Sequence, residues 1–353
     1  MPQRSQPHPQ AQDLGQSHPL QPCWDLQLGG LGADALQAAL DCGLFDHLQH
    51  FTPAERLADR LNLDRHSTGL VLELLWSLAL LERDAQQPPH YRNLPVADQH
   101  LHSAANQYCG DALQFRHRVL RHTGSQLSDY LRNGMAPAAA TPTAMDSAWA
   151  NAARLQIAQE QRAVTREVAC ALLERLPECR HLQRMLDLGG GPGLVAIALA
   201  QALPDLHGVV FEYPETAAVA HGNIEHARLQ QRLQARGGDL NEDDIGSEFD
   251  LIWCSSVLHF VDDLPAMLRR LYAALRPGGL LVCCQAEVPR ERQAAAQVLP
   301  YYLHMRLQGR HVLEEGDLAQ RLQHAGFNAV EQLSGLRFPV TPVNAVIARR
   351  PRG

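Results

Sequence analysis

The sequence predicts an α/β protein in which a mostly parallel, seven-stranded sheet carries helices on both faces and follows a mostly helical N-terminal domain. Strand-length apolar runs alternate with helix-length amphipathic segments through the C-terminal half, a pattern typical of parallel sheets. A glycine-rich turn at residues 189–193 joins an apolar strand to an apolar helix. Residues 24–133 instead show mostly helical spacing, which indicates a separate domain.

Composition narrows the class of protein. The 353 residues are enough for two domains, and an apolar fraction of 45% supports a sizeable core. The net charge of -7 counts against a nucleic-acid partner, because phosphates require clustered Lys and Arg. No apolar run is long enough to span a bilayer, so no membrane association is expected. The 8 cysteines form no Cys-x-x-Cys pair and are interpreted as reduced thiols, which predicts a cytoplasmic protein.

Changes in composition divide the chain into four parts. Residues 1–20 are rich in Gln, Pro, His and Ser and are predicted to be a disordered tail, without the apolar core of a signal peptide. Residues 21–133 form the N-terminal domain, and residues 134–148, rich in Ala, Pro and Thr, form a linker. Residues 149–353 form the sheet domain.

The N-terminal domain begins with a helix expected over residues 31–48. Thr52, Pro53 and Glu55 fit a capping box that opens a short helix, and Asp64 is expected to cap the helix after it.

A polar turn at residues 84–89 then completes a helix, turn, helix and wing, the winged-helix outline. DNA binding is disfavoured because the second helix is apolar nearly all round beyond Arg65 and His66. Such a helix is typically buried in a core or against another subunit.

The sheet domain is predicted from seven strands and their connecting helices. Strands are expected at 185–188, 209–212, near 233, from 249, at 280–284, 330–333 and 343–348. Helices are expected at 148–176, from 194, at 215–229, 264–275 and 315–325. The resulting architecture is Rossmann-like, and ligands of such sheets bind outside the carboxyl ends of the strands.

The glycine turn carries the strongest functional signal. Asp187, Gly189, Gly191 and Gly193 form the pattern Asp-x-Gly-x-Gly-x-Gly, whereas the dinucleotide fingerprint would require a glycine in place of Leu194. A carboxylate at Asp187 suits a cationic amino-acid group better than a pyrophosphate, which it would repel. A glycine turn without a ligand is the alternative.

A second acidic residue lies about twenty residues further on. Glu212 ends an apolar strand, where its carboxylate can accept hydrogen bonds from both hydroxyls of a ribose. A lone acid after a strand is usually solvated surface, but its spacing from the glycine turn favours nucleoside binding.

These patterns resemble two parts of one enzyme family. The glycine turn resembles the S-adenosylmethionine (SAM) loop of class I methyltransferases. Residues 39–46, Ala-Leu-Asp-Cys-Gly-Leu-Phe-Asp, resemble the dimerisation domain of plant caffeate-type and bacterial secondary-metabolite O-methyltransferases. The resemblance implies SAM as cofactor, S-adenosylhomocysteine (SAH) as product, a small-molecule methyl acceptor, and a homodimer formed through the N-terminal domain. It adds four cofactor-binding candidates to those above: Tyr213, Asp239, Leu240 and Ser255.

The resemblance also implies a catalytic histidine. The family pattern Leu-His-Asp-Trp-x-Asp matches residues 258–263, which makes His259 the candidate general base, although Phe260 and Val261 replace the family's Asp and Trp. Two family carboxylates that would orient this imidazole are replaced by Gln285 and His311.

Three chemical interpretations remain open. His259 could act as a base toward an acidic acceptor. His259 and His311 could instead bind a metal, with Glu287, Cys284 or His304 as a third ligand. Finally, the acceptor could need no base at all.

The acceptor-binding residues are predicted from helical spacing and apolar character. Asn151, Arg154 and Gln161 share one face of the helix that borders the acceptor pocket in the family. Phe260, Tyr301, Tyr302 and Met305 would form an apolar, partly aromatic wall.

The function predicted from these features is methyl transfer from SAM to a hydroxyl of a small, aromatic biosynthetic intermediate. C- or N-methylation, with or without assistance from a metal, is the alternative within the same class. A SAM-binding regulatory protein without turnover is the alternative from another class, and a DNA-binding repressor is the least favoured.

Overall fold

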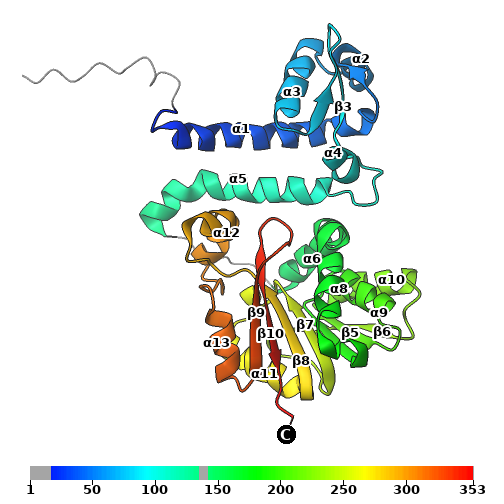
Figure 1. The fold of residues 1–353 in the computed structure, drawn as a ribbon, viewed down its shortest axis with the longest axis vertical. Coiled ribbons are helices and arrows are strands. Elements are labelled where there is room, and N and C mark those ends of the chain that lie inside the picture. Colours follow the sequence, from blue (N-terminus) through cyan, green and yellow to red (C-terminus); the bar gives the residue numbers. More distant parts are fainter. Residues whose placement is uncertain (1–16, 135–141, 353) are drawn as a thin grey trace, which may run out of the picture. The chain divides into compact units, whose positions relative to one another are not determined.

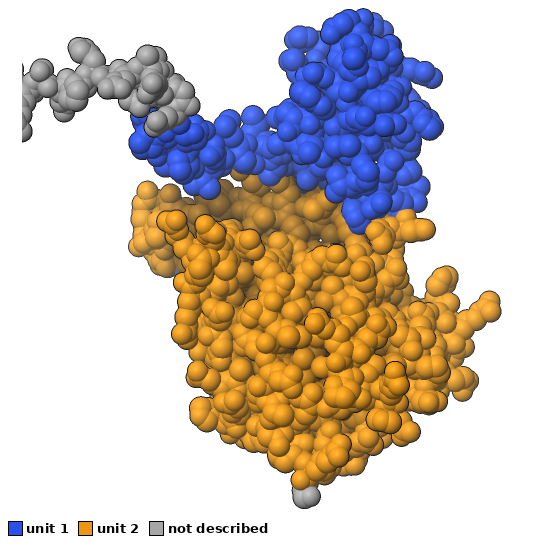
Figure 2. All heavy atoms as spheres, viewed as in Figure 1, with its two compact units in different colours: residues 1–105 blue, residues 106–353 orange. Residues whose placement is uncertain are grey.

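The computed structural model describes residues 17–134 and 142–352, which form two compact units divided after Ala105 (Figure 2). The predicted tail falls outside the described residues up to residue 16. The predicted linker is partly outside them, at 135–141, and residues 142–148 begin helix α6 (Pro142–Ala152) rather than an extended segment. Several alanines in α6 favour that helix.

The first unit has helices around a small antiparallel sheet of strand order β1-β3-β2. Its buried core includes Phe45, Leu72 and Leu75. The turn between β2 and β3 lies at the predicted polar residues. Its elements are α1 (Gln21–Asp41), η2 (Leu44–His47), β1 (Thr52–Pro53), α2 (Ala54–Leu61), α3 (Arg65–Ser77), β2 (Leu81–Arg83), β3 (His90–Asn93) and α4 (Pro95–His100).

The first helix differs from the prediction at both ends. It begins ten residues earlier than residue 31, at Gln21, and ends at Asp41. Gly43 adopts a positive φ of 67°, a conformation that L residues rarely adopt, so the residues after it form the separate turn η2.

The predicted capping box is wrong, whereas the second predicted cap is confirmed. Helix α2 begins at Ala54, and Thr52 pairs with Tyr91 in the sheet. The physical reason is that a residue before proline favours extended backbone. Asp64 does cap α3, because its Oδ1 accepts a hydrogen bond of 2.7 Å from the backbone N–H of Ser67.

The second unit contains the seven-stranded sheet, in the order β6-β5-β4-β7-β8-β10-β9 (Figure 1). Strands β4 to β8 pair with one another in parallel, and β10 is antiparallel to both β8 and β9. The strands are β4 (Arg184–Leu188), β5 (His207–Glu212), β6 (Leu233–Gly237), β7 (Phe249–Ser255), β8 (Leu275–Gln285), β9 (Asn328–Leu336) and β10 (Val343–Arg349). The principal helices are α5 (Gly110–Asn133), α6, α8 (Arg166–Glu174), α9 (Leu194–Ala202), α10 (Pro214–His226), α11 (Leu264–Ala274), α12 (Arg292–Leu307) and α13 (Asp317–His324).

Helices cover both faces of this sheet, as predicted. Side chains alternate along each strand, so Met185 packs with α8, α9 and α10 on one face, while Leu186 packs with α11 and α13 on the other. Figure 1 shows the same two layers of helices.

Helix α5 belongs to the second unit, although the prediction placed residues up to 133 in the first. The side chain of Gln159 joins α5 to the sheet domain. Its Oε1 accepts a hydrogen bond of 3.0 Å from the N–H of Ala112, and its Nε2 donates one of 2.6 Å to Asp111. These contacts cross more than forty residues of sequence, which is why spacing along the chain did not reveal them.

Residues 148–176, predicted as one helix, are helical over most of that range, but they do not form one regular α-helix. Two π-helical turns interrupt it, at Ala153–Ile157 and Gln161–Thr165, on either side of the short α7 (Ala158–Glu160). Such turns shift the helical register and recur at functional sites. Here they bring Ile157, Gln161 and Thr165 to the wall of a pocket.

Candidate active site

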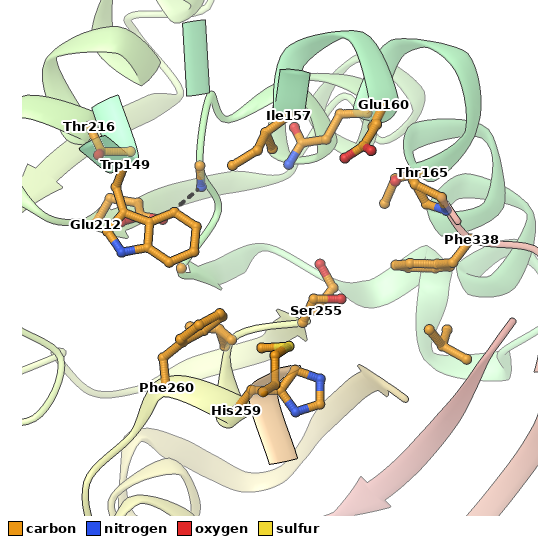
Figure 3. A pocket seen from close by; sticks show the side chains of 18 of the residues that line it. Trp149, Ile157, Glu160, Thr165, Glu212, Thr216, Ser255, His259, Phe260 and Phe338 are labelled. Atoms are coloured by element: carbon orange, nitrogen blue, oxygen red, sulfur yellow. Dashed lines mark hydrogen bonds between the residues drawn. The ribbon is translucent and has the colours of Figure 1, made fainter. Parts of the chain in front are cut away.

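A pocket lies at the carboxyl ends of the central parallel strands, where this architecture places its ligands. Gly189 and Gly191 follow β4, Glu212 ends β5, and Ser255 ends β7. Figure 3 shows Glu212 and Trp149 at one end of the pocket, Thr165 and Phe338 at the other, and His259 between them.

The glycine turn forms part of the wall because no side chain fits there. Gly189 and Gly191 have φ values of +63° and +59°. A Cβ atom at Gly189 would lie 2.3 Å from Cγ2 of Val257. The backbone can therefore approach a ligand closely at both positions. Gly193 precedes α9 as its N-cap residue and is not on the pocket wall.

Gln161 fixes this turn from the π-helical segment. Its Nε2 donates a hydrogen bond of 3.1 Å to the carbonyl of Gly190, and its Oε1 accepts one of 3.1 Å from the N–H of Leu194. The side chain thereby satisfies one of the unpaired N–H groups at the start of α9. Gln161 is the one member of the predicted helical face that lies on the pocket wall.

Glu212 lies on the wall and holds the turn from the other side. Its Oε1 accepts a hydrogen bond of 3.1 Å from Gly191 N–H, and its Oε2 accepts one of 2.9 Å from Tyr213 N–H. Burial raises the pKa of this carboxyl to about 7, against the opposing effect of the two N–H donors.

Asp187 lies beneath the glycine turn rather than on the wall. It is 1% exposed, and a Cβ atom at Gly190 would come within 2.6 Å of its carboxyl group. Strand alternation directs Asp187 toward the helix layer, and its contact with a ligand's amino group stays a prediction. Burial, followed by the charge of Glu212, raises the pKa of Asp187 to about 7.

The remaining predicted cofactor-binding residues divide between wall and loop. Tyr213, Leu240 and Ser255 line the pocket. Asp239 does not, because its Oδ1 accepts a hydrogen bond of 2.8 Å from Asn241 N–H within its own turn.

The raised carboxyl pKa predicts a pH-dependent affinity for the nucleoside. Below pH 7 Glu212 becomes protonated, and it must lose that proton before it can accept hydrogen bonds from two hydroxyls as a carboxylate. We expect the Kd for SAH to rise as the pH falls below about 7, by at most about tenfold per pH unit for one proton. Calorimetry between pH 5.5 and 8.5 measures this, and a flat profile would contradict it.

His259 is buried, and its tautomer is fixed by one contact. Its Nδ1 lies 2.7 Å from the backbone carbonyl oxygen of His311. Because a carbonyl can only accept, Nδ1 carries the proton and Nε2 is left as a bare acceptor. Nε2 is buried and has no hydrogen-bond partner among the described residues. Burial lowers the pKa of His259 to about 4, so the ring is neutral at neutral pH.

The other two predicted catalytic residues do not lie on the pocket wall. The hydrogen bond between the two histidines joins His259 Nδ1 to the backbone carbonyl of His311, which leaves Nδ1 unavailable to a metal. Gln285 is 4% exposed at the end of β8, and its Oε1 has no described partner.

The groups considered as a third metal ligand are engaged elsewhere or buried in the sheet. Glu287 accepts hydrogen bonds of 3.0 Å from Leu318 N–H and 2.9 Å from Asn344 Nδ2, and His304 Nδ1 lies 2.8 Å from the carbonyl of Tyr301. Cys284 is fully buried in β8. Within residues 17–134 and 142–352, no group of three or more His, Cys, Asp or Glu is arranged to hold a metal.

Five of the seven predicted acceptor-binding residues line the pocket: Gln161, Phe260, Tyr301, Tyr302 and Met305. Asn151 and Arg154 do not, and Asn151 is exposed, where its Oδ1 accepts a hydrogen bond of 3.0 Å from Arg154. The π-helical turns explain this error, because they alter the spacing on which the predicted face depended.

Several wall residues were not predicted. Trp149 lies edge-on to Phe260, with ring centroids 5.0 Å apart. Arg116 comes from α5, which the sequence did not assign to this domain. The other unpredicted members of the wall include Glu160, Thr165, Thr216 and Phe338.

Comparison with known proteins identifies the family. Fold and pocket define a nucleoside-binding α/β enzyme with an additional helical domain. Residues 158–332 match the model of a methyltransferase domain, and residues 24–103 match that of an O-methyltransferase dimerisation domain. The N,N-dimethyltransferase OxyT of Streptomyces rimosus is 30% identical over 71% of this chain and 73% of its own length. The chain therefore belongs to the SAM-dependent methyltransferases that carry this dimerisation domain.

Two further similarities extend over almost the whole chain. The tetracenomycin polyketide synthesis 8-O-methyl transferase TcmO of Streptomyces glaucescens is 26% identical over 93% of this chain and 96% of its own length. The crystal structure of human N-acetylserotonin methyltransferase with SAM has a TM-score of 0.77 at 21% identity, and covers 96% of this chain and 99% of that one. The structural likeness shows the shared fold. Among the described helices, none combines the length and apolar character of a membrane span.

Proposed function

We propose that this enzyme transfers the methyl group of SAM to a hydroxyl of a small aromatic molecule. The observation that supports the proposal is His259, a buried and neutral imidazole among the pocket-lining residues, whose Nε2 has no described hydrogen-bond partner. This nitrogen can accept a proton from a hydroxyl, and the aromatic rings of Phe260 and Tyr302 suit a flat acceptor.

The residues present fit SAM. The glycine turn presents bare backbone to the pocket where Val257 and Ile157 leave no room for a side chain, and Glu212 offers carboxylate oxygens to ribose hydroxyls. Asp187 and Glu212 are buried acids of raised pKa, so a cation nearby would favour their ionised forms. SAM supplies an electrophilic methyl carbon bonded to a positively charged sulfur, and its loss of that methyl group leaves neutral sulfur.

The role of His259 is to remove and hold the hydroxyl proton. The proton moves from the acceptor oxygen to Nε2 as the oxygen forms its bond to the methyl carbon. The Nδ1–H bond to the His311 carbonyl orients the ring and stabilises the cation formed, but through a dipole rather than through a carboxylate's full charge. The pKa of about 4 makes His259 a weak base, which favours an acidic hydroxyl such as that of a carbonyl-conjugated phenol.

A panel of phenols with graded acidity tests this function. We expect kcat/KM to increase as the acceptor pKa falls, because less proton affinity is then required of His259. Methylated products are identified by mass and by NMR, which distinguishes O–CH3 from C–CH3. Methylation at carbon or nitrogen throughout the panel would contradict the proposed reaction.

N-methylation is the second candidate. It is favoured by the 30% identity to a relative described as an N,N-dimethyltransferase, and a bare Nε2 could equally accept a proton from nitrogen.

We also propose a homodimer formed through the first unit. Residues 24–103 match a dimerisation domain, and α1 exposes Leu26, Leu28 and Leu31 at 80%, 63% and 59%. Exposed apolar side chains on one helix are typical of a subunit interface. We expect light scattering to give twice the chain mass of 39.0 kDa, and Leu28→Asp to reduce that mass toward the monomer. A wild-type monomer at micromolar concentration would contradict the proposal.

A further inference from the structure

We propose that Tyr301, held by Arg116, donates a hydrogen bond to a carbonyl oxygen of the methyl acceptor. The acceptor would then be a hydroxylated aromatic ketone or quinone, with its carbonyl separate from the hydroxyl that is methylated. This inference rests on the proposed function for the hydroxyl, and it adds a specificity-determining residue and a substrate class.

The first step of the argument is the ion pair behind Tyr301. Arg116 Nε and Nη2 donate to the two oxygens of Glu160 at 2.9 Å and 2.7 Å. Both side chains are largely buried, at 22% and 12% exposed, and both lie on the pocket wall. The pair therefore fixes the guanidinium in place and neutralises its charge.

The second step concerns the proton of the Tyr301 hydroxyl. Arg116 Nη1 donates to the Tyr301 oxygen, and a guanidinium cannot accept a hydrogen bond. The phenol proton must therefore be directed elsewhere, and the hydrogen bonds of the described residues include no acceptor for it. Tyr301 lies on the pocket wall, so an acceptor molecule in the pocket can receive this proton.

The third step is that Tyr301 remains a donor at neutral pH. Burial raises the pKa of its hydroxyl above the ordinary value, and the opposing effect of Arg116 is smaller. The cation bonded to its oxygen nevertheless polarises the O–H group, which strengthens the hydrogen bond that it donates.

The fourth step places this donor apart from the reacting centre. The Tyr302 ring contacts both His259 and Tyr301, with centroid separations of 5.1 Å and 5.0 Å. In Figure 3 Glu160, the partner of Arg116, lies with Thr165 and Phe338 toward the end of the pocket away from Glu212. A flat acceptor can thus present its hydroxyl to His259 and a second oxygen to Tyr301.

The charges around this donor favour a neutral oxygen over an ionised group. A carboxylate would require a free cation, but Glu160 occupies two of the three nitrogen atoms of the Arg116 guanidinium. The pocket's other cation, Arg310, lies over the Phe260 ring, with 5.5 Å between its guanidinium carbon and the ring centroid. An ammonium is disfavoured because it can only donate hydrogen bonds, and the Tyr301 oxygen already accepts one from Arg116. A carbonyl oxygen satisfies that donor without burying charge.

The test compares two acceptors in wild type and in Tyr301→Phe. One is a hydroxytetralone whose ketone is meta to the hydroxyl, and the other is the matching tetrahydronaphthol without the ketone. We expect Tyr301→Phe to lower kcat/KM for the ketone about 10- to 100-fold, mainly through KM, and to change it less than twofold for the naphthol. Tyr272→Phe, in α11 and outside the pocket wall, serves as the matched control.

Equal losses for both acceptors, or no loss for either, would overturn the inference. SAH affinity measured by calorimetry verifies that each variant keeps its cofactor site. If wild type methylates neither acceptor, the proposed function fails, and binding of a tetralone without a hydroxyl to the SAH-loaded protein tests the inference by itself. Weakening of that binding by tenfold or more in Tyr301→Phe supports it, and unchanged binding overturns it.

Discussion

Replacement of His259 by alanine is expected to lower kcat by roughly 10²- to 10⁴-fold while SAH affinity stays within twofold. The Nε2 of His259 has no described hydrogen-bond partner and can take the hydroxyl proton, and removal of the ring takes this base away from the acceptor. The cofactor contacts of Glu212 and the glycine turn do not involve this ring. Single-turnover kinetics with SAM and calorimetry with SAH measure the two quantities separately.

His259→Asn separates the base from the structural role of the ring. An asparagine amide can still donate to the His311 carbonyl, as Nδ1 does at 2.7 Å, but it cannot act as a base. We therefore expect Asn to restore thermal stability relative to Ala without restoring turnover. His207→Ala, at an exposed position at the start of β5, is the matched histidine control. Unchanged turnover in His259→Ala would remove this residue from the mechanism and favour an acceptor that needs no base.

The sheet and its ligand edge could be predicted because their signals are local. Each strand carries a short apolar run, and the glycine turn identifies the strand after which the chain must bend sharply. The spacing from Gly191 to Glu212 likewise survives in the structure as a direct hydrogen bond of 3.1 Å.

The burial of Asp187 beneath the glycine turn was harder to predict, although the alternation of residues along its strand indicated it in part. Asp187 alternates with Leu186 and shares a strand face with Met185, which packs among α8, α9 and α10. Its side chain therefore points into a helix layer, where the glycine turn covers it. The motif indicates which residues meet near the ligand, while the strand register determines which of them touch it.

The catalytic and acceptor residues depended on information that the sequence does not carry. Whether His311 contributes its imidazole or its carbonyl is decided by backbone direction after α12, not by residue type. Arg116 reaches the pocket from α5 through contacts made 44 residues away in sequence, to Glu160, and 185 residues away, to Tyr301. Periodicity within one segment cannot detect such contacts.

Glu212→Gln is expected to raise the Kd for SAH by roughly 10- to 100-fold, since each hydrogen bond to a charged group contributes about 1.5–3 kcal/mol. The carboxylate holds Gly191 N–H and Tyr213 N–H on separate oxygens, and glutamine keeps one acceptor oxygen while its NH2 cannot accept the second hydrogen bond. The substitution therefore loosens the glycine turn as well as removing charge from the ribose site. Glu225→Gln, at an exposed position in the following helix α10, is the matched control.

The pH profile of this variant distinguishes which buried acid controls binding. Glu212 and Asp187 both have pKa values raised to about 7, and Asp146 adds a smaller repulsion at Glu212. If Glu212 carries the dependence, the Gln variant should bind SAH weakly and equally between pH 6 and 8. A slope that persists in the variant would assign the proton to Asp187, beneath the turn, and an unchanged Kd would exclude Glu212 as a ligand of the nucleoside. The pH dependence of the Kd for SAH in wild type and the rise in that Kd in Glu212→Gln both report on the Glu212 carboxylate. The ribose role proposed for Glu212 requires both effects to be observed.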